Sequence, residues 1–192
     1  GPGDALNSFG GGQTPVSFSW DDAFVAAMED DSPIKNKVGA APLPGSDRVW
    51  NRTKGDWDNQ FNQAPYIVWG WAAAVAKKSK NHDMAFDYLC FFSNDANHQA
   101  DIAIGRFGVN PFKKSDFVPS IYVERQGWDE QIAKEYTQTL LDMEEKSTNR
   151  VFPLRVPGVF QFTSAVATGT SKALAGQLSP QEALDEVAAE WE

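Results

Sequence analysis

The order in which strand-like and helix-like patterns follow one another is the feature that most constrains this fold. Strand-like patterns occur only before residue 76, and the rest of the 192 residues shows helical patterns alone. An open parallel sheet needs strands along its whole length, each followed by a helix. The sequence therefore predicts an α/β chain that holds only part of its sheet.

Three segments are expected to form strands. Residues 16–20 alternate apolar and polar side chains, which is the period of a half-buried strand. Residues 38–41 form a second segment, which must end at Pro42 because proline has no N–H for the ladder. Residues 66–75 are continuously apolar and fit a fully buried strand.

Two polar segments are expected to be connections. Residues 46–63 are rich in Asn and Asp and carry Trp50 and Trp57 without a regular period. We expect a long surface loop there, of a length that is uncommon unless the loop has a function. Residues 106–128 hold two prolines and are also expected to be mostly connection.

Helical patterns fill the second half of the chain. We expect helices after Asn81 and at residues 96–104, 129–145, 157–176 and 180–191. The last is the best marked, because Ser179 and Glu182 form a capping box around a proline at the first helical position. The spacing predicts two buried stripes, one of Ala85, Tyr88, Leu89 and Phe92, and one of Leu184, Val187, Ala188 and Trp191.

Composition excludes several classes of function. The chain has 17 Lys and Arg against 26 Asp and Glu, a net charge of -9, and no long basic run. Binding to nucleic acid or to an anionic membrane surface is therefore disfavoured. The longest mainly apolar stretch, residues 66–76, is far shorter than the roughly 20 residues of a membrane-spanning helix.

Metal and catalytic sites are also not expected. The single cysteine, Cys90, excludes a Cys-based zinc site and is expected to be buried, while His82 and His98 are expected on helix surfaces. No nucleophile elbow or phosphate loop is present. Asp21 and Asp22 would point to opposite faces of a strand end, which disfavours their acting on one atom as a catalytic pair. We expect no enzymatic activity, metal or cofactor.

Ligand binding fits the residues better. Asp21 follows an expected strand, and clefts in open α/β sheets form at such carboxyl ends. Trp69 and Trp71 flank a glycine on the longest strand. One of them is expected in the core, and the other either packs there too or lines a cleft.

A third group lies at an expected helix start. Phe160 and Gln161 follow Arg155, a fixed donor fork beside free backbone N–H groups. A competing interpretation pairs Arg155 with an acid and places the phenylalanines in the core.

The chain also resembles a known family in the order and spacing of short motifs. These are VGAAPLPG at 38–45, GWAAAV at 70–75, KSKN at 78–81, AFDYL at 85–89 and ALAGQLSPQEAL at 173–184. They are similar to the C-terminal half of bacterial extracellular solute-binding proteins that serve ABC transporters of sugars and polyols. The resemblance covers about residues 16–192.

The resemblance implies a fold and a domain division. The fold would be α/β and periplasmic-binding-protein-like (type II), with two lobes that close on a ligand, and this chain would be its C-terminal half. Residues 1–45 and 113–192 would form the C-terminal lobe, and residues 46–112 would belong to the N-terminal lobe.

The resemblance also implies a function, partners and a location. The chain would capture a carbohydrate or polyol in the interlobe cleft and deliver it to a membrane permease, in the periplasm or outside the cell. Its other possible partner is the missing N-terminal half as a separate chain. The candidate ligand contacts are Trp20, Asp21, Trp69, Trp71, Arg155, Phe160 and Gln161.

A second hypothesis belongs to another class of protein. The chain would be an interaction domain that reuses part of this fold and binds a partner polypeptide, which exposed Trp50, Trp57 and Trp128 would favour.

Overall fold

Helices dominate the chain. The computed structural model describes residues 2–63, 66–67, 72–105, 109–146, 150–151 and 155–191. Among the described residues, helices hold 93, the 3-10 turn included, and strands hold 14. The predicted α/β, type II periplasmic-binding fold is therefore wrong, because the strands are too short and too few to form a sheet layer.

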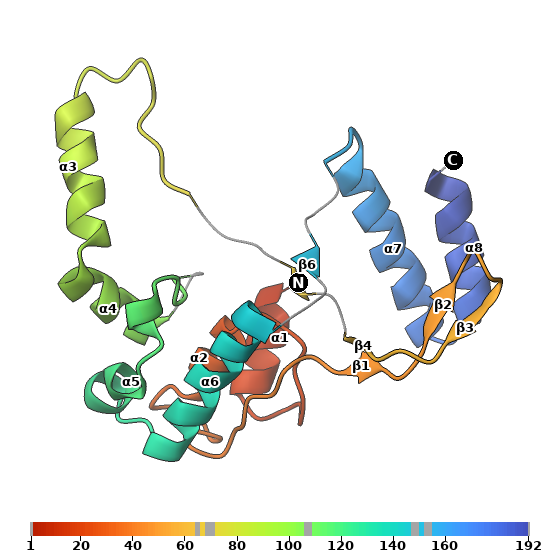
Figure 1. Ribbon diagram of the computed structural model, residues 1–192, viewed down its shortest axis with the longest axis horizontal. Coiled ribbons are helices and arrows are strands. Elements are labelled where there is room, and N and C mark those ends of the chain that lie inside the picture. Colours follow the sequence, from red (N-terminus) through yellow and green to blue (C-terminus); the bar gives the residue numbers. More distant parts are fainter. Residues whose placement is uncertain are drawn as a thin grey trace. The chain divides into compact units, whose positions relative to one another are not determined.

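The chain divides into two compact units, Gly1–Val151 and Phe152–Glu192. This division says nothing about the predicted lobes, 1–45 with 113–192 and 46–112, which stay a prediction. The helices of the first unit (Figure 1) are α1 (Pro2–Gly10), α2 (Asp22–Ala27), α3 (His82–Ser93), α4 (Asp95–Ile104), α5 (Pro119–Gln126) and α6 (Glu130–Lys146), with a 3-10 turn at Lys114–Asp116.

The strands of the first unit form three separate pairs. The pairs are β1 (Gly45–Ser46) with β4 (Asn62–Gln63), antiparallel; β2 (Val49–Asn51) with β3 (Asp56–Asp58), antiparallel; and β5 (Tyr66–Ile67) with β6 (Arg150–Val151), parallel. The strand predicted at 66–75 is thus regular only at residues 66–67 among those described, and residues 72–76 have no regular structure.

Neither of the first two predicted strands forms. Residues 16–20 are irregular and largely exposed. Residues 38–41 lie along α6, where the Glu135 carboxylate accepts the Ala40 N–H at 2.7 Å and the Thr139 hydroxyl donates to the Ala40 carbonyl at 3.2 Å. Helix side chains therefore bond both backbone groups of Ala40, the place that a strand partner would take in a ladder.

The expected loop at residues 46–63 contains a hairpin instead. Trp50 and Trp57 lie directly opposite each other on β2 and β3, with ring centroids 5.6 Å apart. Gly55 supplies the positive φ of 66° that the turn requires. Cross-strand aromatic pairs stabilise short hairpins. The sequence around these two tryptophans has no alternating apolar pattern from which the hairpin could be predicted.

The helix predictions succeed where end signals are present. α3 begins after Asn81, α4 ends at Gly105 with φ 61°, and α6 covers the segment predicted at 129–145. Within 106–128, predicted to be mostly connection, α5 begins at Pro119.

The core of the first unit contains a cluster of four aromatic rings. Phe24 from α2, Tyr122 from α5, Tyr136 from α6 and the intervening Trp128 are buried and packed ring against ring, with centroids 4.6–5.6 Å apart. Such pairs add about 0.5–1.5 kcal/mol each beyond the area they bury. This cluster joins α2, α5 and α6, so Trp128 is not the exposed residue that the interaction hypothesis required.

The second unit is a helical hairpin of α7 (Val159–Leu174) and α8 (Pro180–Trp191). Its capping box is confirmed, because Ser179 Oγ accepts the Glu182 N–H at 3.3 Å and Glu182 Oε2 accepts the Ser179 N–H at 2.8 Å. Gly169 lets the helices approach closely, since an added Cβ would lie 2.8 Å from Val187 Cγ2.

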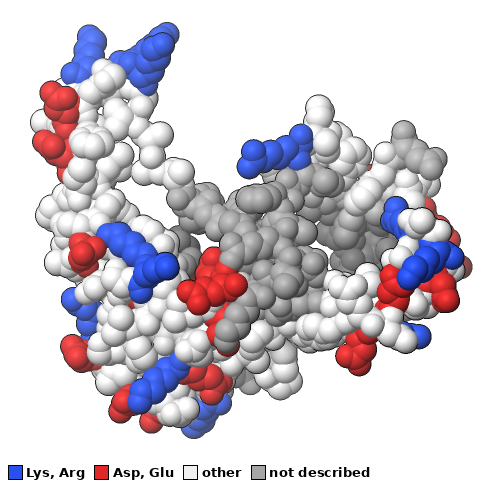
Figure 2. Space-filling view, viewed as in Figure 1, with Lys and Arg blue, Asp and Glu red and all other residues white. Residues whose placement is uncertain are grey.

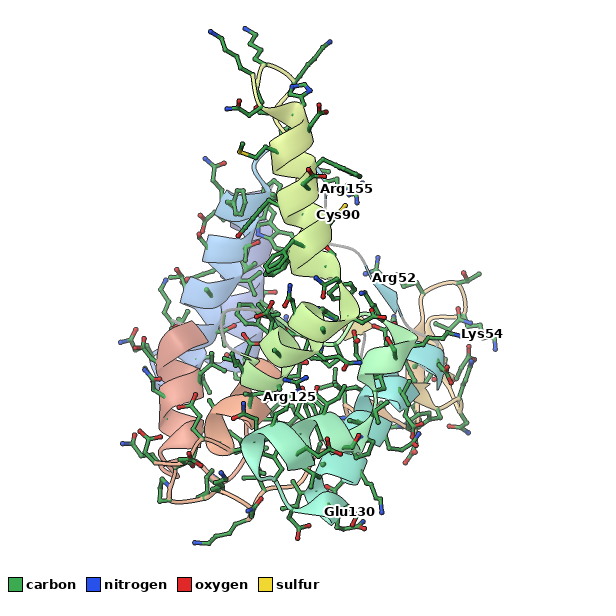
Figure 3. All side chains as sticks on the ribbon, turned by 90° about the vertical axis from the view of Figure 1, so that its left-hand side faces the viewer. Arg52, Lys54, Cys90, Arg125, Glu130 and Arg155 are labelled. Atoms are coloured by element: carbon green, nitrogen blue, oxygen red, sulfur yellow. The ribbon has the colours of Figure 1, made fainter. Side chains whose placement is uncertain are left out.

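Two predicted buried stripes are wrong. In α8 the buried residue is Ala183, whereas Leu184 is 65% exposed. None of the residues of α3 is buried, and Cys90, expected in the core, is exposed (Figure 3). A helical period marks an apolar face but not the neighbour that covers it.

No described helix has the length and apolar character needed to cross a membrane.

Candidate functional site

Two of the predicted site residues, Trp20 and Asp21, lie at the start of α2, where further polar side chains surround them. Trp20 precedes the helix and its side chain is 54% exposed. Asp21 is half-buried, and Asp22 is buried. Burial of the side chains therefore increases along the chain from the indole of Trp20 to the carboxylates of Asp21 and Asp22.

Two side chains from distant segments hold these carboxylates. The Tyr136 hydroxyl, from α6, donates to Asp21 Oδ2 at 3.2 Å, and the Asn110 amide donates to Asp22 Oδ1 at 2.7 Å. These bonds fix the acidic pair to the aromatic core. Asp21 lies on the side open to a ligand, since it is the less buried of the two.

The electrostatics at this helix start disfavour the charged form of Asp21. Burial, followed by the neighbouring charge of Asp22, raises the pKa of Asp21 to about 6, against the lowering effect of the hydrogen bond from Tyr136. Burial beside Asp21 also raises the pKa of Tyr136 well above its ordinary value. Tyr136 therefore stays a hydrogen-bond donor, while Asp21 changes charge in a mildly acidic range.

This arrangement suits recognition of hydroxyl groups. The Asp21 carboxylate keeps acceptor positions beyond the one that Tyr136 uses. The exposed face of Trp20 is available for stacking against C–H groups. Among the described residues, no cluster of three His, Cys, Asp or Glu side chains is arranged to hold a metal ion.

The other predicted ligand contacts are not among the described residues around Trp20 and Asp21. Trp69 and Trp71 lie outside the described residues. Arg155, Phe160 and Gln161 belong to the second unit, around the start of α7, and all three are exposed. Phe160 is 85% exposed, so the interpretation that placed it in the core is wrong.

The start of α7 is built on Gly158, which has φ 81° and whose carbonyl accepts the N–H groups of Gln161 and Phe162 at 2.9 and 3.1 Å. Phe162 packs against Trp191 of α8, with ring centroids 5.6 Å apart. The predicted presentation of Phe160 and Gln161 at a helix start therefore holds within the second unit, but as exposed side chains rather than as the wall of a described cavity.

A buried pair that the sequence did not predict lies in the first unit. His98 Nε2 is 2.7 Å from Asp116 Oδ2, and both side chains are almost fully buried. Asp116 also accepts the N–H groups of Phe112 and Lys113 at 3.0 and 2.7 Å. The prediction of a solvated His98 is wrong. The pair ties α4 to the 3-10 turn and is closed to a substrate by its burial.

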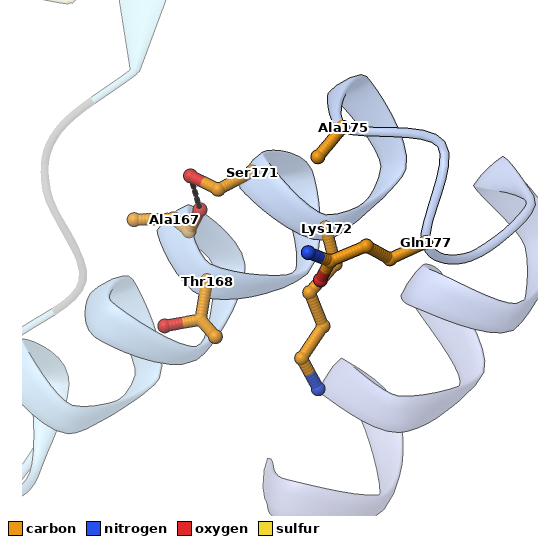
Figure 4. Close-up of a pocket in the computed structure, with 6 residues that line it drawn as sticks. All are labelled: Ala167, Thr168, Ser171, Lys172, Ala175 and Gln177. Atoms are coloured by element: carbon orange, nitrogen blue, oxygen red, sulfur yellow. Dashed lines mark hydrogen bonds between the residues drawn. The ribbon is translucent and has the colours of Figure 1, made fainter.

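A shallow open depression of about 460 Å³ lies in the second unit (Figure 4), lined by Ala167, Thr168, Ser171, Lys172, Ala175 and Gln177. It contains none of the predicted contacts. The Lys172 ammonium bonds Glu186 at 2.6 Å, so its charge is already engaged. We therefore place the candidate site at Trp20 and Asp21.

Sequence reasoning missed Asn110 and Tyr136 at this site. Tyr136 is buried on α6, and a buried tyrosine usually needs a partner for its hydroxyl. That signal points to a buried bond but not to Asp21, which is 115 residues away in the chain. No model of a protein family matches the sequence.

Proposed function

We propose that this chain binds a carbohydrate or polyol-like solute at Trp20 and Asp21, without chemical conversion, as the substrate-binding component of an ABC importer. The observation that carries the proposal is the exposed indole of Trp20 beside the half-buried carboxylate of Asp21. Sugars and polyols offer both an apolar C–H face and hydroxyl donors, and these two side chains match that combination.

The fixed position of Asp21 supports this assignment. Tyr136 holds one oxygen of the carboxylate, so the side chain loses little freedom when a hydroxyl bonds the other. The desolvation that raises its pKa also strengthens any bond that the charged form makes. A hydroxyl donor is therefore a better match than a second anion.

The transport part of the proposal rests on the resemblance of the sequence motifs to solute-binding proteins. It implies a membrane permease as partner and a location in the periplasm or outside the cell. The acidic chain, with a net charge of -9, also makes an anionic solute a poor match for this site.

The test is isothermal titration of the chain with a panel of monosaccharides, disaccharides and polyols. We expect binding by at least one of them to fall at least tenfold in Trp20→Ala and in Asp21→Asn. Trp57→Ala is the matched control, because Trp57 is 49% exposed against 54% for Trp20 but lies in the β2–β3 hairpin.

Two results would contradict the proposal. One is equal loss in all three variants. The other is binding that both site variants leave unchanged. Circular dichroism of each variant shows whether a loss reflects unfolding rather than removal of a contact.

A second candidate function is a protein-interaction domain. The observation that favours it is the set of apolar side chains that α3 leaves exposed. Exposed apolar patches of this kind often mark interfaces. Under this function Trp20→Ala leaves partner binding unchanged, whereas changes on α3 reduce it.

A further inference from the structure

The carboxyl group of Asp21 is surrounded by groups that respond in opposite ways to its charge. The Tyr136 hydroxyl donates to Asp21 Oδ2 at 3.2 Å, whereas the next residue in the chain, Asp22, is a second, buried carboxylate. Asp21 precedes α2, but its side chain makes no hydrogen bond to the N–H groups of that helix. A neutral hydroxyl therefore supports the charged form of Asp21, and a neighbouring carboxylate opposes it.

The helices packed around Asp21 carry the other titratable groups of this region. Tyr136 on α6 and Tyr122 on α5 keep their protons, because burial, followed by the charge of Asp21, raises the pKa of each hydroxyl above its ordinary value. The helix α1, which packs against α2, carries an exposed Asp4. Asp21 itself exchanges its proton in the mildly acidic range, since burial and the charge of Asp22 raise its pKa to about 6.

The charged side chains of α5, and those next to Tyr136 on α6, lie at the surface. Figure 2 shows acidic and basic side chains interspersed over the part of the first unit that these helices form. Water and salt screen charges in such positions, so their effect on Asp21 is small. The exposed side chains are Glu124, Arg125, Lys134 and Glu135.

Protonation weakens the contact that Asp21 can make with a solute. A charged carboxylate accepts charge-assisted hydrogen bonds, which are roughly twice as strong as bonds between neutral groups. The added proton turns one carboxyl oxygen from an acceptor into a donor, while Tyr136 still donates to the other. The exposed indole of Trp20 carries no charge, so its stacking contact does not change with pH. Acid therefore weakens the polar half of the site and leaves the apolar half.

We propose that protonation of Asp21 acts as a release switch, so that the site binds its solute at neutral pH and loses it as the medium becomes mildly acidic. The proposal rests on the proposed function, because both concern the contact between a solute hydroxyl and Asp21. Linkage makes the effect reciprocal, since a solute that binds the charged form also favours that form. Solute binding near pH 6 therefore releases part of a proton to the solvent.

Isothermal titration from pH 4.5 to pH 8 tests the proposal, with glucose, maltose and sorbitol as probes of a monosaccharide, a disaccharide and a polyol. We expect binding to be about fivefold weaker at pH 4.5 than at pH 8, because one charge-assisted bond is lost. At pH 6, titrations in buffers of different ionisation enthalpy should show release of a fraction of a proton. Circular dichroism at each pH shows whether the chain stays folded.

Two tyrosine variants form a matched pair. Each of Tyr136→Phe and Tyr122→Phe removes one hydroxyl from a buried ring of the same aromatic cluster. Tyr136→Phe removes the donor that favours the charged form of Asp21, so we expect the midpoint of the pH profile to rise. Tyr122→Phe should leave the midpoint unchanged, because the Tyr122 hydroxyl has no hydrogen-bond partner among the described residues. Carbon-13 NMR titration of the Asp21 carboxyl group measures the same midpoints without solute.

Asp21→Asn separates this switch from other causes of pH dependence. The variant cannot ionise at position 21, so its weakened binding should be the same at pH 4.5 and pH 8. A pH dependence that persists in Asp21→Asn comes from another group, such as His98, and overturns the proposal. Equal midpoints in the two tyrosine variants overturn it as well. Binding of a probe with the same affinity at every pH contradicts the release switch alone, whereas no binding of any probe at any pH contradicts the proposed function and the switch together.

Discussion

At the scale of single residues, Asp21 links the candidate site to the core. Its neighbours are a solvent-exposed indole on one side and a buried tyrosine hydroxyl on the other. Burial and the charge of Asp22 make ionisation of Asp21 less favourable than in the unfolded chain. The half-buried position that suits Asp21 for binding a ligand therefore lowers the stability of the folded chain when the Asp21 carboxylate is charged.

This cost predicts a pH-dependent effect of Asp21→Asn. The pKa of Asp21 rises from 3.8 to about 6 on folding, so its contribution to stability is present below pH 4 and is lost as the pH rises through 6. Relative to the original chain, the variant should gain melting temperature as the pH rises from 4 to 7.5. Thermal unfolding followed by circular dichroism measures the difference. A difference that stays constant over this range contradicts the prediction.

At the scale of elements, helix ends follow from nearby residues but helix contacts do not. The capping box of α8 joins Ser179 and Glu182, three positions apart, and forms as the sequence predicts. The residue that brings α7 against α8 is Gly169, which carries no helical signal. Its role is steric, because Ala183 and Val187 occupy the space that a side chain would need.

Gly169→Val is expected to destabilise this hairpin. The added Cβ would lie 2.8 Å from Val187 Cγ2 and 3.2 Å from the Ala183 carbonyl oxygen, which cannot move without shifting the helix. Overpacking of this kind costs about 1–3 kcal/mol, more than valine gains over glycine in helix propensity. Thr168→Val, at an exposed neighbouring position, is the control. Chemical denaturation measures both, and equal stability of the two variants contradicts the steric role of Gly169.

At the scale of the whole molecule, each unit has its own packing. The first unit is organised around Phe24, Tyr122, Trp128 and Tyr136, and the second around the contact of α7 with α8. A hairpin of two helices buries little apolar area, so it has a small stability of its own.

Calorimetry is therefore expected to show two thermal transitions. Gly169→Val should lower only the transition of the second unit. Phe24→Ala removes a ring from the aromatic core and should lower only the transition of the first unit, by a loss of about 3–5 kcal/mol. One cooperative transition that both changes shift equally would contradict independent units.

The candidate site was predictable only in part. Asp21 is predicted from its place at the end of an expected strand and Trp20 from the family resemblance, yet both lie at the start of α2. The indole and the carboxylate are adjacent in the chain, so the sequence alone shows that they lie together. Asn110 and Tyr136 reach the acidic pair from 88 and 115 residues away, and no local pattern determines such pairings.

The sequence by itself determined the acidic charge and most helix positions, because a helix bonds residues four apart and its caps lie within one turn. Only the tertiary structure decided where backbone groups outside helices found partners and which apolar faces were covered. Residues 38–41 are β-like in pattern, yet Glu135 and Thr139 of α6 bond the N–H and the carbonyl of Ala40. Strand pairing and burial depend on distant segments, and for that reason the predicted sheet did not form.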